Sequence, residues 1–237
     1  MKQRFKVQVV SCLQELRQGL SLSVLKPQKP FEDEDILPAC STAAKVNSTY
    51  LVTAPYSLGG NLCLSLFNPE GQLLGTQKAI HLNTRLIGFV QSTELTLINT
   101  ELGKIMLCVD VDIYHPEVQR AAKAMGCNLV ISSQYFYEGD YRQEQILFGA
   151  WSEAQANHLC IINANNYTAS VIVPSHTVEE KGFTGFLADV TTQNIIETID
   201  YADIEKAYGA FPIFDTRNLP LYQRHRQQLT GGKADEV

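Results

Sequence analysis

The stretch Gly103-Lys-Ile-Met-Leu-Cys-Val-Asp110-Val-Asp-Ile-Tyr-His-Pro116-Glu117 decides how the fold of this chain is interpreted. The apolar residues before Asp110 predict a strand, and Pro116 stands at a position where proline commonly opens a helix. A sharp turn must lie between the two. The segment therefore predicts a strand, a turn and a helix, with a carboxylate at the end of the strand.

The helix after this turn has the cleanest periodicity in the chain. Val118, Ala121, Ala122 and Met125 fall at i, i+3, i+4 and i+7, and Gly126 ends the pattern. The apolar run that follows, 128–132, predicts a strand buried on both faces. A helix covering a parallel strand pair is expected here.

The rest of the chain continues this alternation without an obvious boundary. Further strands are expected at 5–10, 49–54, 62–67, 73–81, 94–98, 104–109, 158–163, 170–174 and 185–190, and helices at 36–46, at 143–157 and from Asp203 onward. The segment 14–25 is ambiguous. We expect one α/β domain over residues 1–225 and a disordered tail at 226–237.

Composition limits the classes of function. The chain has 237 residues, a net charge of −6 and 45% hydrophobic residues, which is ordinary for a globular domain. The negative charge argues against a nucleic-acid or anionic-membrane partner, and no apolar run reaches the roughly 18 residues needed to span a bilayer. Six cysteines without a CxxC pair predict reduced thiols, a cytoplasmic location and no metal site or cofactor.

The stretch 103–117 resembles the signature of the nitrilase superfamily, the carbon–nitrogen hydrolases. Gly103 and the pair Pro116-Glu117 fit that signature without a gap and place Asp110 where the family has its catalytic cysteine. The segments 61–75, 77–82, 126–132, 151–166 and 217–222 resemble further family motifs in order. The resemblance implies a four-layer α-β-β-α sandwich and a homodimer with Val118–Met125 near the contact.

The family's chemistry uses a Glu as general base, a Lys that stabilises the oxyanion and a Cys nucleophile. The resemblance puts Gln28 at the general-base position, and Gln28 cannot accept a proton; Glu32 and Glu34 are alternatives on an acidic loop. At the position of the oxyanion-stabilising lysine the resemblance puts Ala79. Lys78 is one residue away and faces the other side of the strand unless a bulge intervenes.

The nucleophile position is also altered. A carboxylate is a poor nucleophile toward an amide because the acyl adduct would be an anhydride. Cys108, two residues before Asp110, is the alternative nucleophile, although it lies deeper on the strand and fits a core residue better. Asp112, His115 and Asn163 complete the residues expected near a ligand. Asp110, Asp112 and Glu117 are candidates for an acidic pocket that would take a cation or an amine, but Asp112 and Glu117 fit better as residues that orient the turn and the helix N-terminus. We expect His81 to pack or hydrogen-bond within the fold.

Three hypotheses follow. The first is a pseudoenzyme that keeps the fold and binds a small molecule of unknown identity. The second is a diverged amidase with Cys108 as nucleophile and Lys78 as oxyanion stabiliser. The third is a non-thiol activity built on Asp110, such as metal-assisted hydrolysis, which a divalent-metal titration without binding would count against.

Overall fold

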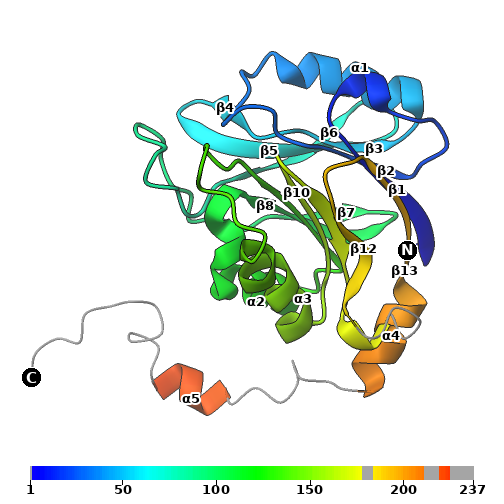
Figure 1. Ribbon diagram of the computed structural model, residues 1–237, viewed down its shortest axis with the longest axis vertical. Coiled ribbons are helices and arrows are strands. Elements are labelled where there is room, and N and C mark those ends of the chain that lie inside the picture. The colour runs from blue at the N-terminus through cyan, green and yellow to red at the C-terminus, as the bar shows by residue number, and fades with distance from the viewer. Residues whose placement is uncertain (1, 178–183, 211–218, 225–237) are drawn as a thin grey trace, which may run out of the picture.

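Alternating apolar residues on the strands build the interface between two β-sheets. The computed structural model of the chain describes residues 2–177, 184–210 and 219–224. Val7 and Val9 of one sheet face the same core as Leu107 and Val109 of the other, as period-two alternation requires. Helices cover the outer face of each sheet (Figure 1), so the expected four-layer α-β-β-α sandwich is confirmed.

The first sheet carries the N-terminal part of the chain. Its order is β13 (Ile195–Asp200), β1 (Arg4–Val10), β2 (Leu22–Leu25), β3 (Tyr50–Val52), β5 (Asn61–Phe67) and β4 (Tyr56–Leu58), with β6 (Leu73–Lys78) also paired to β5. β1, β2 and β3 run parallel to one another. α1 (Ile36–Asn47) covers this sheet and buries Cys40 and Ala44 against it.

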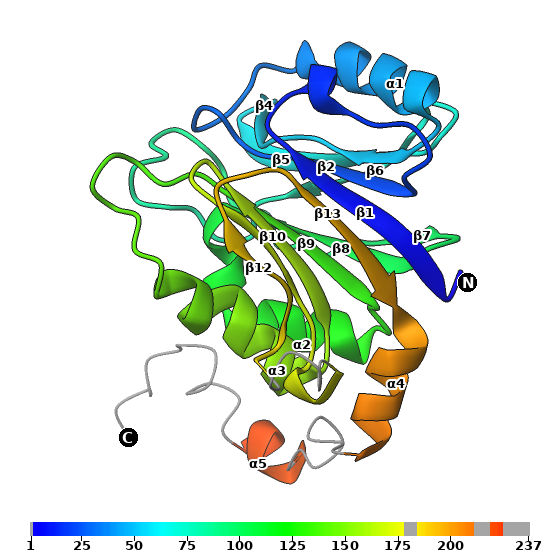
Figure 2. The same ribbon diagram turned by 45° about the vertical axis from the view of Figure 1, so that its right-hand side comes forward.

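The second sheet carries the predicted strand–turn–helix unit. Its order is β12 (Phe186–Thr191), β11 (Ala169–Ile172), β10 (Cys160–Asn165), β9 (Leu129–Gln134), β8 (Gly103–Val109) and β7 (Leu97–Thr100), with β8, β9 and β10 parallel. α2 (Pro116–Ala124) and α3 (Ser152–Asn157) cover its outer face (Figure 2). α4 (Tyr201–Ala210) continues from β13, and α5 (Leu219–Arg224) follows.

Several expected elements change their bounds. The strand expected at 73–81 ends at Lys78, because the main-chain N–H groups of Ile80 and His81 donate to a carboxylate instead of continuing the ladder. The strand expected at 94–98 begins only at Leu97. The helix expected at 143–157 is a π-helical turn, Leu147–Trp151, followed by α3. β13 was not expected, and the predicted tail at 226–237 lies outside the described residues.

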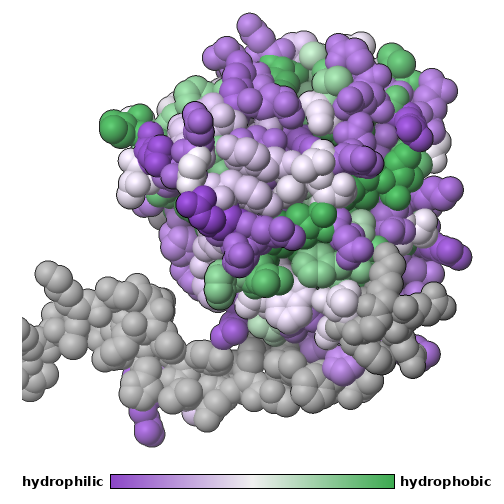
Figure 3. Space-filling model, viewed as in Figure 1, coloured by the Kyte–Doolittle hydropathy of each residue, from purple (hydrophilic) through white to green (hydrophobic). Residues whose placement is uncertain are grey.

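No helix among the described residues combines the length and the apolar character that a membrane crossing needs. Hydrophilic side chains dominate the face drawn in Figure 3, and apolar ones form separate patches on it.

Candidate functional site

Asp110 begins a sharp turn at the end of β8. A 3-10 turn, Asp110–Tyr114, joins β8 to α2, and Asp110 has a φ of 49°. The left-handed region costs energy for residues other than glycine, although aspartate tolerates it better than most. The predicted order of strand, turn and helix is confirmed, and Asp110, which the resemblance assigns to the nucleophile position, lies at the corner between β8 and α2.

The Asp110 carboxyl is nearly shut off from solvent. The residue is 5% exposed, and the main-chain N–H groups of Tyr135 and Val111 donate to its carboxyl group. Its Oδ2 atom makes no hydrogen bond with the described residues. Burial is the main cause that raises the pKa of Asp110 to about 6, and the nearby Asp112 raises it further.

Cys108 faces the helix layer rather than the inter-sheet core. It is 1% exposed and packs in the cluster between the second sheet and α2. The Nε2 group of Gln119, on α2, donates to its Sγ over 3.3 Å. Burial raises the pKa of the Cys108 thiol well above its usual value. The thiol therefore stays protonated at neutral pH, and a protonated thiol is a weak nucleophile.

Lys78, the last residue of β6, and Ala79, which follows it, have opposite exposure. Lys78 is exposed and lies across from Cys63 of β5, whereas Ala79 is 0% exposed and belongs to the core between the sheets. The one register irregularity in this pair falls between Leu66 and Phe67, far from Lys78. No bulge therefore turns Lys78 inward, and Ala79 takes the inward position.

The N-terminal candidates lie on the surface side of the loop after β2. Gln28 is exposed, and its Nε2 group donates to the main-chain oxygen of Lys26 over 3.4 Å. Glu32 pairs with Lys29 at 2.9 Å, and Glu34 is exposed. These contacts are local and stabilise the loop.

Asp112 joins the turn to the segment after β6. Its carboxylate accepts the main-chain N–H of Ile80 at 3.0 Å, the main-chain N–H of His81 at 2.7 Å and Nδ1 of the His81 ring at 2.9 Å. Asp112 is 1% exposed, and burial raises its pKa while these hydrogen bonds lower it. The expectation that His81 hydrogen-bonds within the fold is confirmed.

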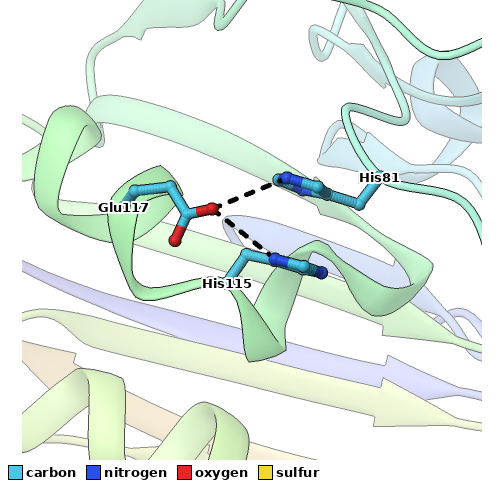
Figure 4. Close-up of side chains that lie close together, drawn as sticks. All are labelled: His81, His115 and Glu117. Carbon is cyan, nitrogen blue, oxygen red and sulfur yellow. Dashed lines mark ion pairs between the residues drawn. The ribbon is translucent and has the colours of Figure 1, made fainter. Parts of the chain in front are cut away.

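His81 and His115 stack on each other beside Glu117. Their ring centroids lie 3.5 Å apart with an interplanar angle of 6°. Glu117 Oε1 lies 3.6 Å from His81 Nε2 and 3.5 Å from His115 Nδ1 (Figure 4). Sequence reasoning treated the three residues separately, because only the fold brings the segment after β6 to the start of α2.

Asn163 on β10 connects to the turn through two hydrogen bonds. Its Oδ1 accepts from Gln134 Nε2 at 2.8 Å, and Gln134 Oε1 accepts from the Tyr114 hydroxyl at 2.8 Å. Tyr114 in turn lines a cavity of about 490 Å³ that lies next to the Asp110 turn. The cavity is lined by Asn83, Val111, Tyr114, Tyr135, Phe136, Gly139, Asp140, Arg142 and Gln145.

Sequence reasoning did not select the tyrosines of this cavity. The aromatic run that follows β9, from Tyr135 to Tyr141, was the available signal, since aromatic side chains with polar tips are frequent in ligand sites. It was not used because no motif contains it.

Comparisons with known proteins agree on the fold. A carbon–nitrogen hydrolase from Helicobacter pylori matches with a TM-score of 0.74 at 16% identity, covering 93% of this chain and 97% of that one. Nit3 of Saccharomyces cerevisiae, a member of branch 10 of the nitrilase superfamily, matches with a TM-score of 0.73 at 17% identity, covering 92% and 97%. The chain has the nitrilase-superfamily fold. The comparisons therefore confirm the fold that the resemblance of the signature stretch implied.

An amidase and a protein named as a hydrolase are also similar to this chain. An amidase from Nesterenkonia sp. shares the nitrilase fold with a TM-score of 0.71 at 14% identity, covering 94% of this chain and 97% of that one. A Schizosaccharomyces pombe protein named as a hydrolase is 26% identical over an alignment of 205 residues that covers 78% of this chain. The matched part of this chain spans 63% of that relative's length. No family model matches the chain.

Proposed function

We propose that this chain is a nitrilase-fold protein without thiol-dependent hydrolysis, which binds a small molecule as a pseudoenzyme. The observation that carries the proposal is Asp110 at the corner between β8 and α2, with a φ of 49° and 5% exposure. A carboxylate there would give an anhydride on attack of an amide, so the thiolate route has no counterpart at this position.

The surroundings of Asp110 support the same conclusion. The inward position on the strand that would supply an oxyanion-stabilising lysine is Ala79, and the exposed Lys78 faces the other side. Gln28, at the general-base position implied by the resemblance, carries no basic oxygen that can hold a proton. Hydrolysis of an amide by the family's route would need other residues as nucleophile, oxyanion stabiliser and general base.

The cavity next to the turn is the proposed binding site. Its volume of about 490 Å³ suits a small organic molecule, and its walls combine aromatic rings with the polar groups of Asn83, Arg142 and Gln145. The hydrogen-bonded path from Tyr114 through Gln134 to Asn163 ties the wall of this cavity to the second sheet. We infer that Asn163 acts by orienting Tyr114.

The test is ammonia release from a panel of short amides and nitriles, measured for the wild type, for Cys108→Ser and for the matched buried-cysteine variant Cys63→Ser. We expect no release that depends on Cys108. Release abolished in Cys108→Ser and kept in Cys63→Ser would overturn the proposal in favour of the diverged amidase with Cys108 as its nucleophile.

A homodimer and a cytoplasmic location remain part of the proposal. Phe148 is 77% exposed and Leu147 47% exposed, on the helical layer that α2 and α3 form. Burying such side chains between two copies would be favourable. Light scattering of the wild type and of Phe148→Ser tests the dimer, because the variant should shift toward monomer.

All six cysteines are free thiols, which suits the reducing compartment that a cytoplasmic location would provide.

A further inference from the structure

Three side chains from two separate segments converge beside α2. His81 comes from the segment after β6, whereas His115 and Glu117 come from the start of α2. One ligand atom of each lies within 4.8 Å of the other two. We propose that His81, His115 and Glu117 bind a divalent transition-metal ion of the zinc type.

The donor set fits such an ion. Two imidazole nitrogens and one carboxylate oxygen are ligands that zinc accepts, and three protein ligands leave a fourth position for water. Zinc holds these atoms at about 2.0–2.2 Å, so neighbouring ligands of a tetrahedral site lie about 3.3–3.6 Å apart. Glu117 Oε1 already lies 3.6 Å from His81 Nε2 and 3.5 Å from His115 Nδ1.

Asp112 prepares His81 for this role. Its carboxylate accepts from Nδ1 of the ring at 2.9 Å, which leaves the Nε2 lone pair directed toward Glu117. A carboxylate behind a ligating histidine is the usual arrangement that fixes the ring and raises its basicity. Asp112 is 1% exposed and is held by two main-chain N–H groups, so this orientation is built into the fold.

The ion can reach the site, and the rings can adjust to it. The side chains of Glu117 and His115 are 66% and 38% exposed, and that of His81 is 26% exposed. The two rings are stacked, so they must tilt toward a shared point when both bind one ion (Figure 4). The exposed His115 has room for this movement, while Asp112 holds His81.

Electrostatics favour a cation on balance. The N-terminus of α2 opposes a positive charge by about 1 kcal/mol, a small effect beside the attraction of the adjacent carboxylates of Glu117 and Asp112. The earlier expectation of no metal site rested on the absence of CxxC pairs, and this cluster contains no cysteine.

The proposed ion would connect the segment after β6 to α2. Because such a bridge exists only in the folded state, bound metal should raise the thermal unfolding midpoint. This inference is independent of the pseudoenzyme proposal, since it concerns residues outside the cavity and assumes no reaction.

The test is calorimetric titration of tag-free, metal-stripped protein with Zn²⁺ at pH 7.5, together with the visible absorption of a Co²⁺ titration. We expect one ion per chain and a Co²⁺ spectrum of low coordination number. His115→Ala and Glu117→Gln should each weaken Zn²⁺ binding by about 100-fold or more, whereas His176→Ala, which removes a histidine elsewhere, should leave it unchanged.

Circular dichroism of each variant establishes that it is folded, so that lost binding reports on the ligands. Absence of Zn²⁺ binding to the wild type would overturn the proposal. Binding that persists unchanged in both His115→Ala and Glu117→Gln would also overturn it, because the ion would then lie elsewhere.

Discussion

The carboxylate of Asp112 holds His81 at two points: its Oδ1 atom lies 2.7 Å from the main-chain nitrogen of His81 and 2.9 Å from Nδ1 of the His81 ring. The same carboxylate accepts the N–H of Ile80. One buried side chain therefore ends β6 and fixes the loop that follows it against the turn before α2. The contact spans 31 residues of sequence, and no local pattern predicts it.

We expect Asp112→Ala to destabilise the fold by about 2–4 kcal/mol, because it leaves the partly buried N–H groups of Ile80 and His81 without a partner. Urea unfolding of the variant measures this change. Asp140→Ala, which removes an exposed ion pair with Arg85, is the control and should cost less than about 1 kcal/mol. Equal effects of the two substitutions would show that the Asp112 contacts contribute little.

Asp110→Asn should stabilise the protein in a pH-dependent way. Burial raises the pKa of Asp110 from 3.8 to about 6, so the folded state binds a proton more tightly than the unfolded state. Stability from this residue therefore falls as pH rises from about 4 to about 6, and the penalty is full above that range. Asparagine removes the charge and keeps an oxygen that accepts from Tyr135 and Val111.

The expected gain is up to about 3 kcal/mol at pH 8 and close to zero at pH 4. Unfolding curves for wild type and variant at both values measure it, with Asp33→Asn on an exposed loop as the control. A gain of the same size at both pH values would mean that the effect does not come from the carboxylate's ionisation.

Sequence patterns within single segments correctly predicted those helices and strands whose ends and burial depend on residues close together in the sequence. Pro116 and Gly126 bracket α2 because one suits the first helical turn and the other ends it, and β9 is buried as its apolar composition indicates. The signature stretch also identified the corner at Asp110. In each of these places the residues near one another in sequence are the ones that interact.

Tertiary contacts explain what the sequence did not predict. β13 pairs with β1, which lies almost 200 residues earlier in the chain, and its sequence Ile-Ile-Glu-Thr-Ile-Asp lacks the strict apolar–polar alternation that predicts a half-buried strand. The helix expected from residue 143 is interrupted by a π-helical turn. There Gly149 lies so close to Tyr114 that a Cβ atom would be 2.7 Å from its ring.

The candidate site was predicted residue by residue but not as an arrangement. Asp112 and His115 were selected separately, and the residue that contacts both is His81, which was expected to pack or hydrogen-bond within the fold but was not linked to either of them. The stacking of His81 on His115 depends on how far β6 extends, and Asp112 determines that end point. Such geometry follows from the assembled sheets and has no signature in one segment.

Alkylation should separate the cysteines by exposure. Cys12 is exposed, whereas Cys108 is buried with its thiol pKa raised by burial. We expect iodoacetamide at pH 7.5 to label Cys12 at least about 100 times faster than Cys108, because little thiolate forms at the buried site and the reagent cannot reach it. Peptide mass spectrometry at timed intervals measures both rates. Fast labelling of Cys108 in native protein would contradict its placement beneath α2.

The two residues at the expected lysine position should respond oppositely to substitution. Lys78 is exposed, so Lys78→Ala should change the free energy of unfolding by no more than about 0.5 kcal/mol. Ala79 is 0% exposed between the sheets, and Ala79→Lys would place an unpaired cation there. We expect a loss of about 3–5 kcal/mol, or failure to fold.

Ala79→Met separates volume from charge, because it adds a side chain of similar length without the ammonium group. Overpacking alone should cost about 1–3 kcal/mol, so the lysine variant should be the less stable of the two in guanidinium unfolding. If Ala79→Lys is instead as stable as Ala79→Met, the position must open to a polar pocket that accommodates a lysine. The chain would then retain space for the oxyanion-stabilising group, and the case for lost catalysis would rest on Asp110 and Gln28 alone.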